Sequence, residues 1–500
     1  MKIYVKITAL ILSVLFLSAP LFSCANNTPP VTEPITEPIT EPVTEPVTAP
    51  VTEPIAEPVT EPVTEPVTVP MIDPVTEPAT EPTTEPVIAE AYSEYEGFYY
   101  KINTDNTVTL VEYVGNAEDI VIPSNIEGLP VTELGNDLFG KQVLLYCIGT
   151  AYQVTYELEA KIGDGHQPRS ITIPDTVTTI GERAFAGCML LEEIYIPDSV
   201  VEIGKYAFVA CLSLHTIRLP KNLTAIEQYT FSHCEALKTI DIPDTVTTVG
   251  SCAFQESGLV EITFTNVEEL GSSAFSYCKE LKKVTLSPKM TVISAFLFER
   301  CYNLVDVVIP EGITIIETYA FIGCSSYKNV TLPNTVTHIY TAAFDIPYET
   351  ITKRSIVLSE SLIYVGEHNF YGDGYNYTYA NGAYYLGTAD NPHFMLCKFD
   401  YYSEIQQIHP DTKILAVQSG HNGAELNIPD SVTVIMRLHL KYFEDKVNQI
   451  IIPASVKYIY EGAFYKGTEA TFENSELTYS EYVQEYYDWK YYRGSDIFFK

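Results

Sequence analysis

Apolar residues recur at a fixed interval through the middle of the chain. Eight similar segments follow one another at steps of 22 or 23 residues and begin at Ile171, Ile194, Ile217, Ile240, Ile262, Val284, Val307 and Val330. In the second segment Ile194 and Ile196 alternate with polar residues, which predicts a short strand, and Pro197 ends it. One such unit buries too little apolar surface to be stable alone, so we expect the units to stack around a continuous core.

The repeats predict a solenoid over residues 97–475. We expect a mainly β repeat solenoid with short parallel strands on one face and short helical or 3-10 turns between the strands. The copies lose their regular spacing at about residues 367–420, which predicts an interruption of the array. The aromatic segment 476–500 follows the last copy, and we expect it to cap the open end of the core.

A cysteine stands three residues after the phenylalanine in six of the copies. These residues are Cys188, Cys211, Cys234, Cys278, Cys301 and Cys324, and Ser257 takes the position in an intervening copy. Exchange of Cys with Ser beside a buried Phe indicates a small buried filler. Disulfides between neighbouring copies remain an alternative. Zinc binding by cysteines is disfavoured because no CxxC pair occurs, and six equivalent cysteines indicate no single nucleophile.

The first 96 residues differ from the rest in composition. Lys2 and Lys6 precede an apolar run from residue 7 to 17, which predicts a signal peptide over residues 1–23. The following sequence LFSC resembles the lipobox of bacterial lipoproteins and implies lipidation of Cys24, with ordinary secretion as the alternative. Proline then occupies every fourth position from Pro30 to Pro86, which excludes helix and sheet and predicts a disordered Pro/Thr/Glu-rich stalk over residues 24–96.

The net charge of −36 narrows the range of partners. Residues 25–96 hold 15 acidic and no basic residues, and the segment from residue 97 onward holds 50 acidic against 27 basic residues. This acidity argues against a nucleic-acid or anionic-membrane surface. No second apolar run is long enough to span a bilayer, so we expect membrane attachment only through the N-terminal lipid.

The repeat pattern IPDSVxxIxxxAFxxCxxLxxI resembles the BspA-type leucine-rich repeat proteins of bacterial surfaces. Residues 120–140, IVIPSNIEGLPVTELGNDLFG, fit the same pattern, and residues 385–399, YLGTADNPHFMLCKF, are similar to a segment that interrupts the repeats in that family. The resemblance covers roughly residues 97–470. It implies surface exposure and, in some members, adhesion to matrix proteins or to other cells.

Catalytic signatures are missing from the sequence. It contains no GxSxG, HExxH, GxxxxGK[ST] or GxGxxG pattern, and its nine histidines are dispersed. We therefore expect no enzymatic activity, no cofactor and no bound metal.

Binding residues are expected on the exposed side of the strands and in the interruption. Residues that alternate with the buried Ile and Val point outward, and the interruption is rich in tyrosine. The predicted ligand-binding residues are Glu193, Tyr195, Arg218, Asp241, Lys283, Asp306, Tyr371, Tyr375, Tyr377, Tyr379 and Tyr384. Two plainer interpretations stay open. In one, the outward strand residues form a solvated sheet face. In the other, the tyrosines pack the interruption onto the solenoid.

The sequence therefore favours an exported, lipid-anchored cell-surface protein that binds a protein or glycan ligand through its solenoid. A structural cell-envelope spacer without a dedicated ligand is one alternative. A hydrolase with an unrecognised site in the interruption is the other.

Overall fold

The structure is a computed structural model that describes residues 92–139, 167–345, 353–370, 374–400, 402–403, 406–417, 426–436, 449–460, 463 and 469–473. The predictions of a signal peptide, a stalk up to residue 91, lipidation at Cys24 and a cap over residues 476–500 lie outside these residues. Within them, no helix is both long and apolar enough to cross a membrane. All described residues belong to one compact unit, Pro86–Lys500.

An antiparallel meander begins this unit. It consists of β1 (Ser93–Tyr95), β2 (Phe98–Ile102) and β3 (Val108–Tyr113). Its last strand pairs in parallel with β6 (Leu129–Leu134), which also pairs with the short β5 (Asn125–Ile126). The meander thereby covers the N-terminal end of the repeat core. This cap was not predicted from the sequence.

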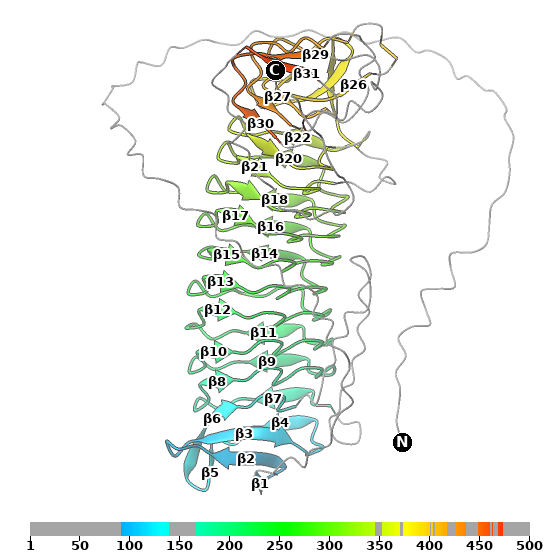
Figure 1. Cartoon of the computed structure of the whole chain (residues 1–500). Coiled ribbons are helices and arrows are strands. Elements are labelled where there is room, and N and C mark those ends of the chain that lie inside the picture. The colour runs from blue at the N-terminus through cyan, green and yellow to red at the C-terminus, as the bar shows by residue number, and fades with distance from the viewer. Residues whose placement is uncertain are drawn as a thin grey trace, which may run out of the picture. The chain divides into compact units, whose positions relative to one another are not determined.

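Two columns of short parallel strands follow, so the predicted solenoid is confirmed (Figure 1). The first column contains β4 (Asp119–Val121), β7 (Ser170–Thr172), β9 (Glu193–Tyr195), β11 (Thr216–Arg218), β14 (Glu261–Thr263), β16 (Lys283–Thr285), β18 (Asp306–Val308), β20 (Asn329–Thr331) and β22 (Ser355–Val357). The second contains β8 (Thr179–Ile180), β10 (Glu202–Ile203), β12 (Ala225–Ile226), β13 (Thr248–Val249), β15 (Glu269–Leu270), β17 (Val292–Ile293), β19 (Ile315–Ile316), β21 (His338–Ile339) and β23 (Tyr364–Val365). Equivalent residues of successive copies pair with each other, as Ile171, Ile194 and Ile217 do.

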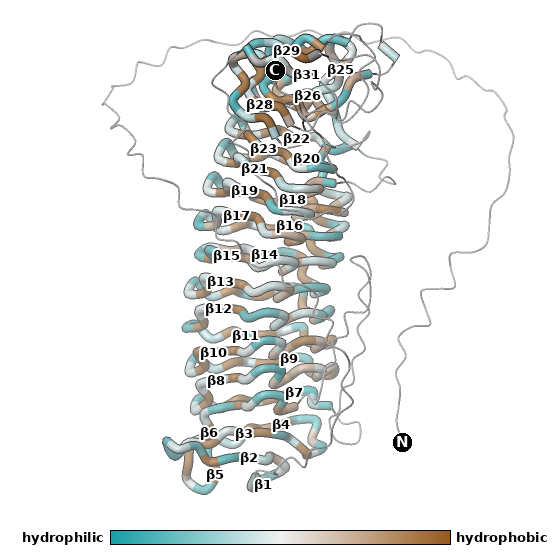
Figure 2. The backbone as a smooth tube through the Cα atoms, in the orientation of Figure 1, coloured by the Kyte–Doolittle hydropathy of each residue, from teal (hydrophilic) through white to brown (hydrophobic). Residues whose placement is uncertain are grey.

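Stacked phenylalanines form the spine of the core. From Phe185 to Phe344, one ring per repeat stacks on the next at centroid separations of 5.0 to 5.8 Å. Apolar segments return in every turn of the backbone (Figure 2), and their side chains belong to one continuous buried cluster. Truncating one of these rings to alanine is expected to cost about 3 to 5 kcal/mol.

The cysteine column lies beside these rings and supplies hydrogen bonds as well as volume. All eight cysteines among the described residues are free thiols, so the disulfide alternative finds no support there. Five of the thiols donate to the carbonyl of the phenylalanine one repeat earlier, as Cys211 does to Phe185 at 3.2 Å and Cys301 to Phe275 at 3.0 Å. Ser257 takes the same place in its copy, where its hydroxyl lies 3.4 Å from Cys278 Sγ.

The segments around each phenylalanine form turns, and no helix is assigned among the described residues. The expected short helical or 3-10 turns take the form of single i→i−3 hydrogen bonds, such as Ala184 N–H to the Gly181 carbonyl. Two positions per turn have positive φ, for example Tyr206 at 60° and Ala210 at 58°. A left-handed residue cannot continue a right-handed helix, so the N–H groups at these positions bond to the next turn instead, as Tyr206 does to Gln228.

The predicted interruption is the start of a second, shorter array. It opens with an antiparallel meander of β24 (Thr378–Ala380), β25 (Ala383–Leu386) and β26 (Met395–Phe399). Parallel strands β27 (Ile414–Leu415), β28 (Val434–Ile435) and β30 (Tyr458–Ile459) follow, and β29 (Gln449–Ile452) pairs with β31 (Glu469–Phe472).

This second meander repeats the geometry of the first. Each has a tight hairpin turn with two residues at positive φ, Glu96 and Gly97 in one and Asn381 and Gly382 in the other. Each also has a register shift between consecutive tyrosines, at residues 99/100 and 384/385. We infer that one structural device begins both arrays.

The six-stranded sheet of the second array lies between two cores. Alternate residues of a strand point to opposite faces, and here both faces are covered. Met395, Cys397, Ile414, Val434 and Met436 belong to the core of the first array. The residues between them, Leu396, Leu415 and Ile435, belong to a separate cluster within the second array. The sheet therefore closes the far end of the first solenoid while opening the second.

Candidate functional site

The outward residues of the first strand column lie side by side, as predicted. Tyr195 is paired with Thr172 on one side and with Arg218 on the other. Lys283 is flanked in the same way by Glu261 and Asp306. The predicted members of the column are exposed, with Tyr195 at 57%, so the geometry makes them available to a ligand without assigning them one.

The column is not continuous. The copy that contains Asp241 lacks the strand of the first column, and the hydrogen-bonded ladder stops at β11 and resumes at β14. Ile240 of this copy stays 9% exposed and keeps its place in the core. Asp241 is therefore exposed at a break between two separate sheets.

Three of the predicted charged groups, Arg218, Lys283 and Asp306, are engaged within the protein. Arg218 Nη2 lies 2.7 Å from Asp198 Oδ1, and Lys283 Nζ lies 3.6 Å from Asp306 Oδ2. Ion pairs this exposed contribute little to stability. They do neutralise the charges that a ligand would otherwise meet on this part of the face.

The predicted tyrosines of the interruption mostly pack against the protein. Tyr371 lies outside the described residues. Tyr375 is 1% exposed and donates to the Phe344 carbonyl, while the half-buried Tyr377 donates to the Phe370 carbonyl at 2.6 Å. These hydrogen bonds attach the second array to the last turns of the first, so a ligand-binding role for Tyr375 is not compatible with its burial.

The outer part of the tyrosine group forms an exposed aromatic edge. Tyr379 is 52% exposed and its hydroxyl lies 3.2 Å from Asp400 Oδ2. Tyr384 packs against Tyr379 at 4.9 Å, and the ammonium of Lys398 lies 4.9 Å from the Tyr384 ring centre. Of the predicted tyrosines of the interruption that the structure describes, Tyr379 has the largest exposed fraction.

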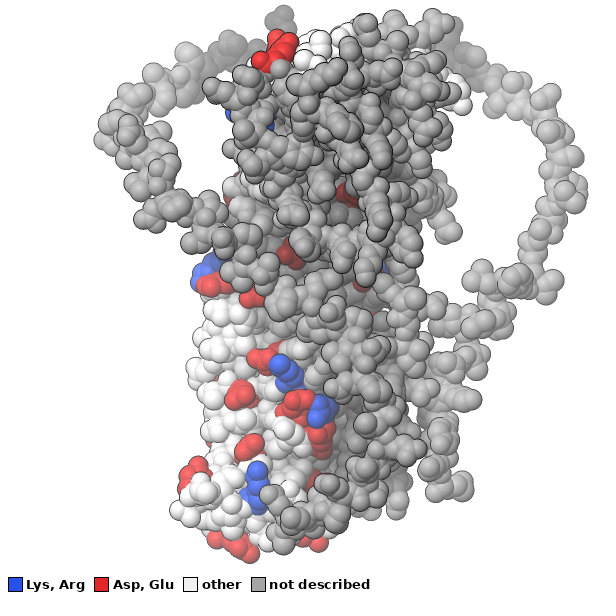
Figure 3. Space-filling view, viewed as in Figure 1, with Lys and Arg blue, Asp and Glu red and all other residues white. Residues whose placement is uncertain are grey.

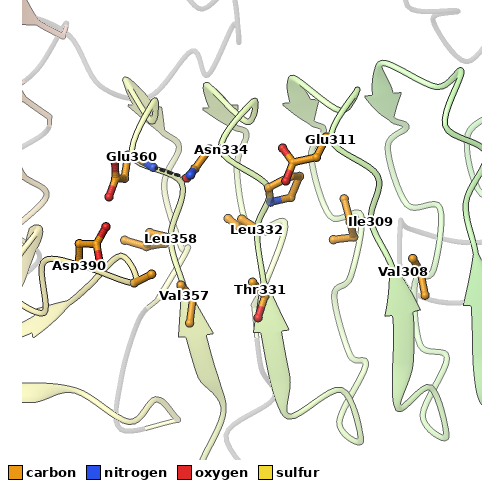
Figure 4. A pocket seen from close by; sticks show the side chains of 12 residues that line it. Val308, Ile309, Glu311, Thr331, Leu332, Asn334, Val357, Leu358, Glu360 and Asp390 are labelled. Carbon is orange, nitrogen blue, oxygen red and sulfur yellow. Dashed lines mark hydrogen bonds between the residues drawn. The ribbon is translucent and has the colours of Figure 1, made fainter. Parts of the chain in front are cut away.

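A groove of about 470 Å³ lies where the first column meets the second array (Figure 4). Its floor contains the outward residues Val308, Thr331 and Val357 of three strands in the predicted column. The turn residues that follow these strands line one side, and residues 389–390 in the loop after β25 complete the wall. The groove therefore joins the two places where binding was expected.

The groove is acidic. Glu311 and Glu360 occupy the turn position that follows the strand in their copies, and Asp390 belongs to the loop of the second array. All three are exposed, and none has an ion-pair partner within the part of the chain that the structure describes. Asn334, between the two glutamates, accepts a hydrogen bond from the Glu360 N–H at 3.2 Å.

None of these three carboxylates was predicted from the sequence as a binding residue. The signal for Glu311 and Glu360 was present, because the residue after the strand-ending position is acidic in several copies, including Asp175, Asp198 and Asp244. Asp390 could not be placed from sequence, since its approach to the groove depends on how the second array meets the first.

Charges elsewhere on the visible face are mixed. Basic side chains there lie beside acidic ones and do not form a patch of their own (Figure 3). The exposed pairs Arg169–Glu118 and Arg169–Glu192 are examples, at 3.3 and 3.0 Å.

Comparisons with known proteins agree with the repeat architecture. A family profile described as "BspA type Leucine rich repeat region" matches six copies over residues 164–278, 261–376 and 416–488. No curated protein sequence matches the chain.

Three solved structures illustrate the likeness to bacterial repeat proteins. A leucine-rich repeat protein of T. pallidum is 27% identical, covering 47% of this chain and 90% of its own, with a TM-score of 0.34. A leucine-rich cell surface protein of Faecalibacterium prausnitzii A2-165 is 22% identical, covering 58% and 94%, with a TM-score of 0.32. The pneumococcal vaccine antigen PcpA is 18% identical, covering 74% and 98%, with a TM-score of 0.37.

Proposed function

Because the chain belongs to the BspA-type leucine-rich repeat family, whose repeats form a scaffold and carry no catalytic motif in this sequence, we propose that it is a cell-surface binding protein. Its ligand is held in the acidic groove where the first strand column meets the second array. The single observation that carries the proposal is the convergence of Glu311, Glu360 and Asp390, unpaired and exposed, around that groove.

The chemistry of the groove favours a protein ligand with basic side chains. Carboxylates that have no internal partner attract lysine and arginine, and arginine can bind a carboxylate through two hydrogen bonds. The floor offers Val308, Thr331 and Val357, which suit the aliphatic stems of such side chains. Complementary charge of this kind accelerates association and selects partners more than it adds affinity.

The N-terminal region fits the same proposal. The signal-like residues 1–23 and the LFSC sequence support export and lipid attachment at Cys24. The proline-rich segment has no basic residues to bind an anionic surface and, at about 3.1 Å per residue in extended form, it would hold the binding unit away from the membrane. Adhesion or ligand capture outside the cell follows from this arrangement.

A binding screen tests the proposal. The full chain would be applied to immobilised matrix proteins, mucins, glycans and bacterial surface fractions. Each hit would then be measured with the variant Glu311→Gln/Glu360→Gln/Asp390→Asn and with a control variant Asp175→Asn/Glu202→Gln/Glu235→Gln, whose residues are also exposed acids. We expect the groove variant to lose at least about tenfold in affinity and the control to stay unchanged.

Other outcomes would redirect the assignment. Equal weakening by both variants would indicate a general charge effect. No saturable binding by folded protein would favour a structural spacer. Turnover of a substrate that one substitution in residues 374–417 abolishes would establish a hydrolase.

A further inference from the structure

Two histidines and an aspartate that are separated in sequence meet at the start of the second array. His393 precedes β26, and His409 and Asp411 lie in the turn that precedes β27. Parallel pairing of β26 with β27 brings these two approaches together. The imidazoles are half-buried, and Asp411 is exposed, so the cluster is accessible from solvent.

The potential ligand atoms converge. One atom from each of the three side chains lies within 4.8 Å of the other two. His409 Nδ1 is 3.6 Å from Asp411 Oδ2, and it accepts a hydrogen bond from the Asp411 N–H at 3.3 Å. That nitrogen has a single lone pair, so an ion bound through Nδ1 would replace this hydrogen bond. A zinc ion at roughly 2.0 to 2.2 Å from both atoms would subtend an angle of about 120°, close to tetrahedral.

Neighbouring residues hold the cluster in place. Asn391 accepts the His393 N–H at 3.0 Å and donates to the Asp411 carbonyl at 2.8 Å, so it connects the two segments. The hydroxyl of Tyr385 accepts the His409 N–H at 2.9 Å. The edge of the same buried ring faces both imidazoles, at centroid distances of 5.4 and 6.4 Å. These hydrogen bonds fix the backbone of the two segments that carry the cluster.

The two imidazoles stack with their centroids 3.7 Å apart and their planes 18° from parallel. The nitrogen lone pairs of stacked rings lie in nearly parallel planes, so binding of one shared ion requires an imidazole to rotate out of the stack. Two imidazole nitrogens with one carboxylate form a ligand set that suits Zn²⁺ and related divalent ions such as Co²⁺ and Ni²⁺. Exposed carboxylates alone would favour the harder Ca²⁺ and Mg²⁺.

We propose that His393, His409 and Asp411 bind one divalent transition-metal ion of the Zn²⁺ class. Three protein ligands leave a coordination position open to water or to a group from a bound partner. The site uses none of the three carboxylates of the acidic groove. A bound ion would connect two segments, the turn before β27 and the loop that contains both Asp390 and His393.

Cobalt binding tests the site directly, because the d–d absorption of bound Co²⁺ reports its coordination. The tag-free full chain would be titrated with Co²⁺ and then with Zn²⁺. We expect one equivalent of Co²⁺ to give a tetrahedral or five-coordinate spectrum, which Zn²⁺ abolishes by displacement. His393→Gln, His409→Gln and Asp411→Asn should each weaken binding at least about tenfold, while His215→Gln, at an exposed histidine of the first array, should not.

Three results would overturn the proposal. One is an absence of stoichiometric binding below 100-fold excess metal. A second is unchanged affinity in His393→Gln. The third is a thiolate-to-cobalt charge-transfer band, which would place the ion on a cysteine. Circular dichroism spectra of the variants would establish that each is folded, and a rise in the wild-type melting temperature with Zn²⁺ that the variants lack provides a second readout.

Discussion

At the scale of single residues, the cysteine column is structural. Each buried thiol fills a gap beside a phenylalanine ring, and five of them also donate to a backbone carbonyl. Burial raises the pKa of the Cys234 and Cys278 thiols to about 12, which removes the reactive thiolate at neutral pH. The position was predicted from sequence as a small filler, whereas the hydrogen bond depends on a backbone path that the sequence does not specify.

The first prediction concerns thiol reactivity. In the folded protein, maleimide should leave Cys188, Cys211, Cys234 and Cys301 unmodified, because these thiols are buried and protonated. The partly exposed Cys252 serves as the internal control and should react. Site-resolved mass spectrometry, with and without denaturant, measures the difference. Modification of Cys234 at the rate of Cys252 would contradict the buried column.

The second prediction concerns pH. Burial lowers the pKa of His338 below its ordinary 6.5, so the unfolded chain binds this proton more readily than the folded one does. Its contribution to stability is therefore complete above pH 6.5 and is lost as the pH falls through the lower folded-state pKa. Denaturant midpoints should fall between pH 7.5 and pH 5.5, and the decrease should be smaller in His338→Gln. An equal decrease in the variant would assign the effect to other groups.

At the scale of the repeat element, the turns combine left-handed residues with hydrogen bonds between copies. Most of the left-handed positions are not glycine, and a non-glycine residue there costs about 1 to 2 kcal/mol. The stacked turns offset this cost through hydrogen bonds such as Phe208 N–H to the Thr230 carbonyl. The strand positions could be predicted from the spacing of apolar residues. The left-handed backbone angles could not, because tyrosine, arginine and serine have these angles and give no sequence signal for them.

Two adjacent serines provide the third prediction. Ser273 has a φ of 59°, whereas its neighbour Ser272 is not left-handed. Ser273→Gly should raise the free energy of unfolding by a few tenths to about 1 kcal/mol, because glycine removes the steric cost. Ser272→Gly should lower it by about 0.5 to 1 kcal/mol through the entropy of the unfolded chain. Urea unfolding measures both, and changes of the same sign would contradict the backbone assignment.

At the scale of the whole molecule, the described unit consists of two arrays that share one sheet. The solenoid, the strand columns and the place of the interruption were predictable from the repeats. The nature of the interruption was not, because its tyrosines suggest binding and packing equally well until Tyr375 is found beneath Phe344. The cluster of His393, His409 and Asp411 and the acidic groove were also not predicted from the sequence. The reason is related, because both depend on contacts between separate elements.

The shared sheet leads to the fourth prediction. Cys397 faces the first core and Leu396 the second. Cys397→Asn should therefore expose the last turns of the first array to hydrogen exchange, with protection lost near Phe344. Leu396→Asn, which also buries an amide without a partner, should instead loosen residues 406–417. Residue-resolved exchange measures both variants, and identical exchange patterns would mean that the sheet does not separate two cores.

The salt dependence of ligand affinity tests the central functional claim most directly. The dissociation constant of a ligand found in the binding screen would be measured from 50 to 500 mM salt, for the wild type and for Glu311→Gln/Glu360→Gln/Asp390→Asn. If the groove binds basic side chains, the wild-type affinity should fall steeply with salt, and the variant should be weaker and nearly insensitive to salt. Equal affinity and equal salt dependence in the two proteins would show that the ligand binds elsewhere.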